Sequence, residues 1–122
     1  MANLEQVYQA LRPLLAQHAA VLVVTHDEPE QLYLDTAFLQ QNKKPLFFGA
    51  VQLKKNYVSY HLMPIYLAPE LLDGISAVLR ARMQGKSCFN FKTVEPKLFA
   101  ELATLTATGL AYYQQQGYLA AK

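Results

Sequence analysis

Apolar positions near the start of the chain recur at helical spacing, and those that follow alternate as they do in strands. From Leu4 to Leu15 the apolar residues fall on one side of a helix, and Asn3 stands three residues before Gln6 as in a capping box. Pro13 interrupts this run, because proline removes a backbone donor inside a helix. We therefore expect an N-terminal helix that is kinked or shortened at Pro13.

Two pairs of short alternating segments follow, and each pair predicts a β-hairpin. Residues 21–25 and 31–36 flank an acidic turn, and residues 46–53 and 57–63 flank Lys54-Lys55-Asn56. We expect the asparagine of this second turn to adopt a positive φ. On the last strand Val58, Tyr60 and Leu62 should face one side of the sheet, and Tyr57, Ser59, His61 and Met63 the other.

The second half of the chain predicts helices around a short strand. Pro69 opens a helix whose buried stripe comprises Leu71, Leu72, Ile75, Val78 and Leu79. Residues 88–91 can add a fifth strand, and a last helix runs from Glu95-Pro96 to Gly117. The predicted fold class is α+β, a single domain over residues 1–122. It has an N-terminal helix, a mainly antiparallel sheet of four to five strands, and two C-terminal helices packed on it.

Composition narrows the class of protein further. Hydrophobic residues make up 52% of the chain and charged residues 16%, a balance that supports a packed core. The longest strongly apolar run, residues 19–24, is far shorter than the roughly 20 residues of a membrane-spanning helix. The N-terminus lacks the pattern of a secretory leader. We expect a cytoplasmic protein with no membrane partner, and a net charge of +2 gives no reason to expect nucleic acid.

Charge is distributed unevenly along the chain. Residues 1–40 carry one basic and five acidic side chains, whereas residues 41–100 carry nine basic and three acidic ones. In the basic region, Gly85-Lys86-Ser87 imitates the end of a phosphate-binding loop, but the glycine required five residues upstream is Arg80. This excludes a Walker motif.

What remains is a basic cluster around Gly85 that can attract a small anion or a metal chelate. We predict that the ligand-binding residues are Arg80, Arg82, Lys86, Ser87, Lys92, His61 and Tyr60. The alternative is a solvated helix end, at which Arg80 and Arg82 complement the helix dipole.

Cys88 is the only cysteine, which excludes an internal disulfide. With Lys86 and Lys92 nearby its thiol pKa could be lowered, and His61 could supply a base. A cysteine in the apolar stretch of residues 88–91 is more typical of a core position, so we expect Cys88 in the core.

The acidic hairpin offers a second candidate site. His26, Asp27, Glu28, Glu30 and Asp35 supply an imidazole and four carboxylates, ligands that suit iron, manganese or magnesium. Solvated turn residues are the alternative, because acidic turns are common on soluble proteins.

Three segments carry a resemblance to a known family. They are residues 44–51, 57–64 and 85–92, with the "Gly-Lys-Ser" stretch followed by a terminal helix that contains Leu98, Phe99 and Leu102. Over residues 43–117 the chain resembles the YdhG-like family, which is related to frataxin-like proteins. The resemblance implies a small intracellular α/β sandwich, and in at least one relative an iron-chaperone role. The first helix departs from the acidic ridge of frataxin-type proteins, since Glu5 is its only acid.

These observations leave three functional hypotheses. The first is a non-enzymatic protein that binds a small anion or metal chelate at the basic segment. The second is iron delivery through the acidic hairpin, with iron as the cargo. The third is a thiol or acid–base enzyme that uses Cys88, although no catalytic motif is present.

Overall fold

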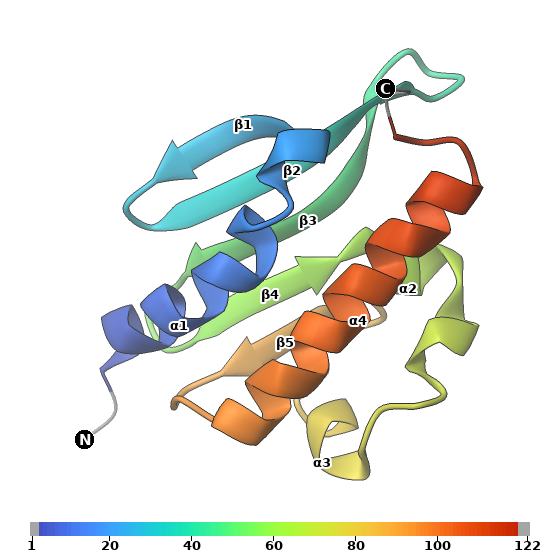
Figure 1. Cartoon of the computed structure of the whole chain (residues 1–122). Helices are drawn as coiled ribbons and strands as arrows, with labels where there is room; N and C mark the ends of the chain where they lie inside the picture. Colours follow the sequence, from blue (N-terminus) through green and yellow to red (C-terminus); the bar gives the residue numbers. More distant parts are fainter. Residues whose placement is uncertain (1–2, 120–122) are drawn as a thin grey trace.

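The computed structural model describes residues 3–119, and it shows an antiparallel sheet with helices on one face (Figure 1). In chain order the elements are α1 (Leu4–Ala16), η1 (Ala19–Val21), β1 (Val23–Glu28), β2 (Gln31–Leu39), β3 (Pro45–Leu53), β4 (Val58–Leu62), α2 (Met63–Leu67), η2 (Pro69–Leu72), α3 (Ala77–Arg80), β5 (Cys88–Phe91) and α4 (Pro96–Gln115). The predicted α+β class is confirmed.

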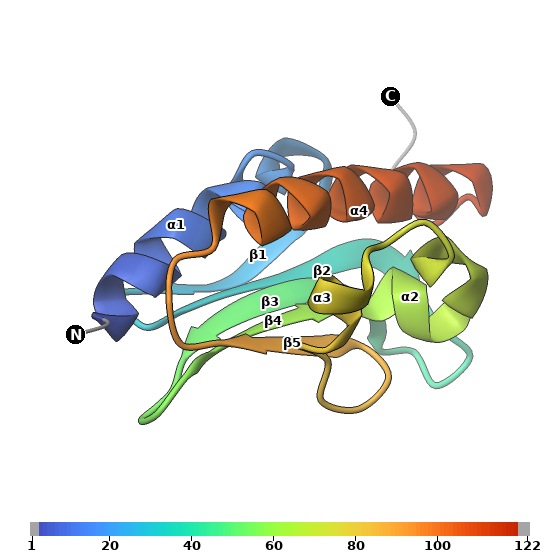
Figure 2. The same ribbon diagram turned by 90° about the horizontal axis from the view of Figure 1, so that it is seen from below.

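The five strands lie side by side in chain order, each antiparallel to its neighbour. Both predicted hairpins and the fifth strand are present. Figure 2 shows α1 and α4 on the same side of the sheet, while no helix within residues 3–119 lies on the opposite side. We call that opposite side the open face.

The core lies between the sheet and the two long helices. Alternate strand residues, among them Leu34, Val51 and Phe89, are buried against helix residues such as Leu11 and Leu102. Within this apolar layer the Tyr60 hydroxyl and Thr106 Oγ1 lie 2.6 Å apart, and Thr106 Oγ1 donates to the Leu102 carbonyl. These two buried hydroxyls are thus paired across the sheet–helix interface, which limits the free-energy cost of burying them.

The two edges of the sheet differ. Every residue of β1 is exposed, and Val23 and Val24 show 43% and 44% of their surface. At the other edge, the Asn90 amide donates to the Arg82 carbonyl at 2.8 Å, and the Gln84 amide donates to the Cys88 carbonyl at 2.9 Å. Residues 82–84 therefore cover the outer side of β5.

The prediction of a single helix after Pro69 is wrong. The structure has two short elements there, η2 and α3, because Gly74 interrupts the chain and Ser76 starts a new turn by capping the Leu79 amide. Glu101 of α4 holds this cap by accepting hydrogen bonds from the Ser76 amide and hydroxyl at 2.8 and 2.7 Å. Val78, predicted to be buried, is 56% exposed.

Two smaller predictions about the backbone also need correction. The described non-glycine residues include only one with a positive φ, and it is Lys43 rather than Asn56. The first helix was expected to be kinked or shortened at Pro13, and it continues through Pro13 as one helix that ends at Ala16. Within residues 3–119 no helix has the length and apolar character needed to cross a membrane.

Candidate functional site

The open face of β4 and β5 brings together polar side chains from two distant parts of the chain. Side chains alternate across a strand, and Tyr60 and Phe89 point to the helices, so their neighbours point the other way. We call the six neighbours the β4–β5 strip: Tyr57, Ser59 and His61 from β4 and the residue before it, and Cys88, Asn90 and Lys92 from β5 and the residue after it. The sequence pattern predicted this face for the three β4 side chains.

A thiol and an imidazole meet at one end of the strip. His61 pairs with Cys88 in the sheet register, and the Cys88 Sγ lies 3.6 Å from the His61 Nε2. The thiol also lies 3.4 Å from the Asn90 Oδ1, to which it can donate. Cys88 is half-buried on the open face, so the expectation of a core cysteine is wrong.

Burial sets the charge state of this pair. It raises the pKa of the Cys88 thiol above its ordinary value, and only the charge of Lys54 and a backbone hydrogen bond from Tyr60 oppose that shift. Burial also lowers the pKa of His61, and the charge of Lys54 lowers it further. The thiol is thus protonated and the imidazole neutral near pH 7, contrary to a thiolate stabilised by Lys86 and Lys92.

The middle of the strip contains an unpartnered hydroxyl. Ser59 is only 2% exposed, and its Oγ has no hydrogen-bond partner among the described residues. Its cross-strand neighbours are Gln52 on β3 and Asn90 on β5. A buried hydroxyl without a partner costs about 1–3 kcal/mol, so its retention calls for an explanation.

A hollow of about 370 Å³ lies at the other end of the strip. It is lined by Tyr57, Ala81, Arg82, Gln84, Asn90, Lys92, Thr93 and Glu95, and we call it the Arg82–Lys92 hollow. Glu95 accepts two hydrogen bonds from Arg82, at 2.9 Å from Nε and 2.7 Å from an Nη atom. This bidentate pair holds the guanidinium in place and raises its pKa.

The structure divides the predicted ligand-binding residues. Arg82 and Lys92 line the hollow, and His61 lies on the same strip. Lys86 and Ser87 precede β5, at the end opposite Lys92, and do not line the hollow.

Arg80 and Tyr60 are engaged elsewhere. The Arg80 guanidinium donates to the Leu72 carbonyl at 2.8 Å. The prediction for Tyr60 is wrong, because its side chain is fully buried on the helix side against Thr106. A side chain on that side of the sheet cannot share a cleft with His61.

The structure does not bring the five residues of the predicted acidic metal site together. Asp27 pairs with Arg12 of α1, whereas the neighbouring His26 and Glu28 project to the other face of β1, with 3.8 Å between Nδ1 and Oε1. Asp35 pairs with Val23, at the opposite end of the hairpin from Glu28. Within residues 3–119 no three His, Cys, Asp or Glu side chains gather as metal ligands.

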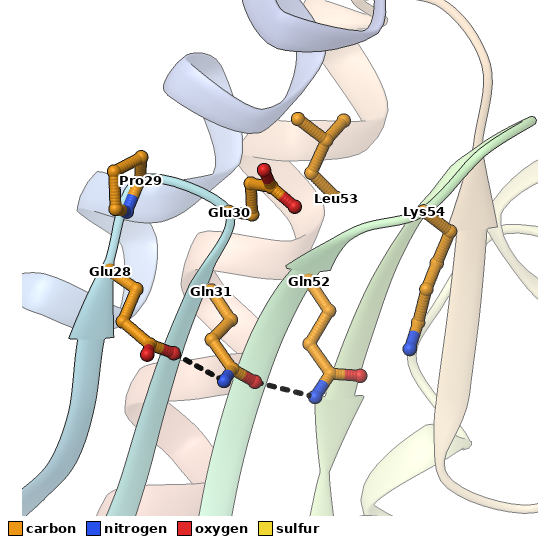
Figure 3. A pocket seen from close by; sticks show the side chains of 7 residues that line it. All are labelled: Glu28, Pro29, Glu30, Gln31, Gln52, Leu53 and Lys54. Atoms are coloured by element: carbon orange, nitrogen blue, oxygen red, sulfur yellow. Dashed lines mark hydrogen bonds between the residues drawn. The ribbon is translucent and has the colours of Figure 1, made fainter.

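A second hollow, of about 450 Å³, lies at the turn end of this hairpin (Figure 3). Figure 3 shows Glu28, Gln31 and Gln52 joined by hydrogen bonds across three strands, while Glu30 points away from them beside Leu53. The Gln52 amide donates to Gln31 at 3.1 Å. The Glu28 carboxylate therefore takes part in a chain of hydrogen bonds with Gln31 and Gln52, and it does not form a shared site with Glu30.

The sequence analysis did not identify several residues of the candidate site. Asn90, Gln84 and Glu95 enter the hollow because residues 82–84 bond to β5, a contact that no local pattern encodes. Lys54 acts on the thiol–imidazole pair from the end of β3. The alternation of side chains along residues 88–92 was the one sequence signal for this site. It could have placed Asn90 on the same face of the sheet as Ser59, with which it pairs.

Comparisons of the chain with protein-family models, with curated proteins and with solved structures found no match. The fold and the candidate site therefore carry the functional argument.

The lowered pKa of His61 makes a prediction about stability. Below its ordinary value of 6.5 the unfolded chain binds the proton more readily than the native state, so this group lowers the free energy of unfolding as pH falls. We expect His61→Gln to lessen the drop in urea midpoint between about pH 7.5 and about pH 5.5. His26→Gln, on the exposed edge strand, is the control. A His61 variant with the full parental drop would contradict the prediction.

Proposed function

We propose that this protein binds a small anion, such as a phosphate or carboxylate compound or a metal chelate with free carboxylates, in the Arg82–Lys92 hollow. The observation that carries the proposal is the meeting of Arg82 and Lys92 in one concave site with neutral hydrogen-bonding groups from Tyr57, Gln84 and Asn90. Pockets of this kind, with a few convergent polar groups, are the usual form of small-molecule sites.

The charges in the hollow favour a ligand of modest negative charge. Glu95 already neutralises Arg82, and its two hydrogen bonds fix the guanidinium before any ligand binds. Lys92 has no carboxylate within 4.0 Å among residues 3–119. The lysine ammonium supplies the uncompensated charge, and a charge-assisted hydrogen bond to it is stronger than a neutral one.

Thermal-shift measurements with phosphate, citrate, iron-citrate and nucleotides test the proposal, because a ligand that binds the native state raises the melting temperature. We expect at least one of these anions to stabilise the protein and Lys92→Ala to weaken its binding by about 10- to 100-fold, the value of one charge-assisted hydrogen bond. Lys86→Ala is the matched control, since Lys86 is a nearby lysine outside the hollow. The proposal fails if no anion stabilises the protein, or if Lys92→Ala binds as tightly as the Lys86 control.

The relation to the YdhG-like family and a cytoplasmic location are parts of the same proposal. The order of N-terminal helix, antiparallel sheet and C-terminal helix agrees with the sandwich that the resemblance implies. Iron delivery through the hairpin is not part of it, because Asp27 is paired with Arg12 and faces away from Glu28.

A further inference from the structure

The thiol and the imidazole of the β4–β5 strip lie on the same face of the sheet as the Arg82–Lys92 hollow, and the buried Ser59 hydroxyl lies between them in the strand register. Asn90 joins the two regions, since it lines the hollow and its Oδ1 lies 3.4 Å from the Cys88 Sγ. Four residues separate Cys88 from Lys92, which corresponds to about 13 Å along an extended chain. A ligand of that length reaches both ends.

We propose that Cys88 and His61 form a nucleophilic acyl-transfer site for an ester or thioester whose anionic end binds in the Arg82–Lys92 hollow. The anchoring of the anionic end rests on the proposed function above. The reaction at the thiol does not, because it depends on the strip alone.

Geometry places a base next to the nucleophile. The Cys88 Sγ and the His61 Nε2 are 3.6 Å apart, within reach of a sulfur hydrogen bond. In the tautomer that carries its proton on Nδ1, the Nε2 lone pair faces the thiol and can accept its proton. A nucleophile with an adjacent base is the minimal arrangement for covalent catalysis.

The charge states support a neutral pair rather than a preformed ion pair. Burial keeps the His61 pKa below its ordinary value, so the imidazole is free to accept a proton at neutral pH. The raised pKa of Cys88 means that the thiol requires this base, and a thiolate of higher pKa is intrinsically the stronger nucleophile. Lys54 is the charged group that acts on both side chains.

Besides the Cys88–His61 pair, Ser59 is an independent indication that a ligand binds here. It is 2% exposed, its Oγ has no partner, and it points to the same face as His61. Ser59 is diagonal to Cys88 across the β4–β5 pair, a relation that separates residues by about 7–8 Å. Its hydroxyl can donate to the oxyanion that forms when the thiol attacks.

The reaction balances within these groups. The thiol proton passes to Nε2 of His61 while Sγ bonds to the acyl carbon. The bond from that carbon to the leaving oxygen or sulfur then breaks, and the leaving group takes the proton from the imidazolium. Water, deprotonated by the same imidazole, cleaves the thioester on Cys88, releases a carboxylic acid and restores the thiol. No oxidant or reductant is consumed.

The test uses the full chain with p-nitrophenyl acetate and with the p-nitrophenyl monoester of decanedioic acid, a diacid whose extended chain approaches the length that separates Cys88 from Lys92. We expect a burst of nitrophenolate and an acyl adduct that mass spectrometry assigns to Cys88, the only thiol in the chain. Cys88→Ser should abolish the adduct, and His61→Gln should slow acylation about 100-fold. The proposal is overturned if there is no burst, if the adduct persists in Cys88→Ser, or if His61→Gln reacts at the parental rate.

Two further variants separate the parts of the proposal. Ser59→Ala should slow acylation about 100-fold while leaving the urea midpoint unchanged or higher, because it removes an unsatisfied buried hydroxyl. If Ser59 has only a structural role, Ser59→Ala should leave the acylation rate unchanged and lower the urea midpoint. Lys92→Ala should raise the ratio of the KM for the decanedioate ester to the KM for the acetate ester, and Lys86→Ala should leave that ratio unchanged. A KM ratio that Lys92→Ala leaves unchanged would overturn the anionic anchor while leaving the thiol reaction in place. The thermal-shift measurements decide the proposed function separately.

Discussion

Tyr113→Ala is expected to lower the free energy of unfolding by about 3–5 kcal/mol, the range for removing a large buried aromatic side chain. Tyr113 is fully buried, and its ring meets Phe48 edge to face, with 5.4 Å between the ring centroids. Its hydroxyl donates to the Phe47 carbonyl at 2.6 Å, so one side chain ties α4 to β3 by packing and by hydrogen bonding. Urea denaturation monitored by circular dichroism measures the loss.

Tyr113→Phe is the matched control, because it keeps the ring and removes only the hydroxyl. We expect it to cost about 1 kcal/mol, the net value of one hydrogen bond. A Tyr113→Ala protein as stable as the phenylalanine variant would show that the ring does not join the two layers.

Gly49→Ala is expected to lower the free energy of unfolding by about 1–3 kcal/mol. A Cβ atom at this buried position would lie 2.8 Å from the His61 carbonyl oxygen and 3.1 Å from a methyl group of Leu15. The carbonyl belongs to the backbone of the adjacent strand, so it cannot rotate away as a side chain would. The sheet or α1 must move instead.

Gly74→Ala provides the control for this change. Nothing lies within 4 Å of a Cβ built at Gly74, and its φ is not positive, so alanine there should be neutral or stabilise by up to about 1 kcal/mol. Equal urea midpoints for the two alanine variants would contradict the close approach of β3 to β4 at Gly49.

The strands and the two long helices could be predicted from the sequence because their signals are local. Alternation over a few residues was enough to place Ser59 and His61 on one face of β4 and Tyr60 on the other. The region between β4 and β5 could not be predicted in the same way. There, Ser76 depends on a carboxylate 25 residues further along the chain, and no local period reports that contact.

The sequence could predict individual residues of the candidate site but not the contacts between them. Cys88 and His61 are separated by 27 residues, and their contact depends on the register between β4 and β5. A shift of one residue would have turned one of them toward the helices. Arg82 likewise looked like a free charge in the sequence, but its pairing with Glu95 requires the chain to fold back over β5.

Only one of the two edges of the sheet is open to another strand. Residues 82–84 occupy the hydrogen-bonding positions beside β5, so an extended peptide that adds to the sheet as a sixth strand must pair with β1. Four strands, β1 to β4, would separate such a peptide from Cys88 on β5. Growth of the sheet at β1 and the proposed reaction at Cys88 therefore involve different residues.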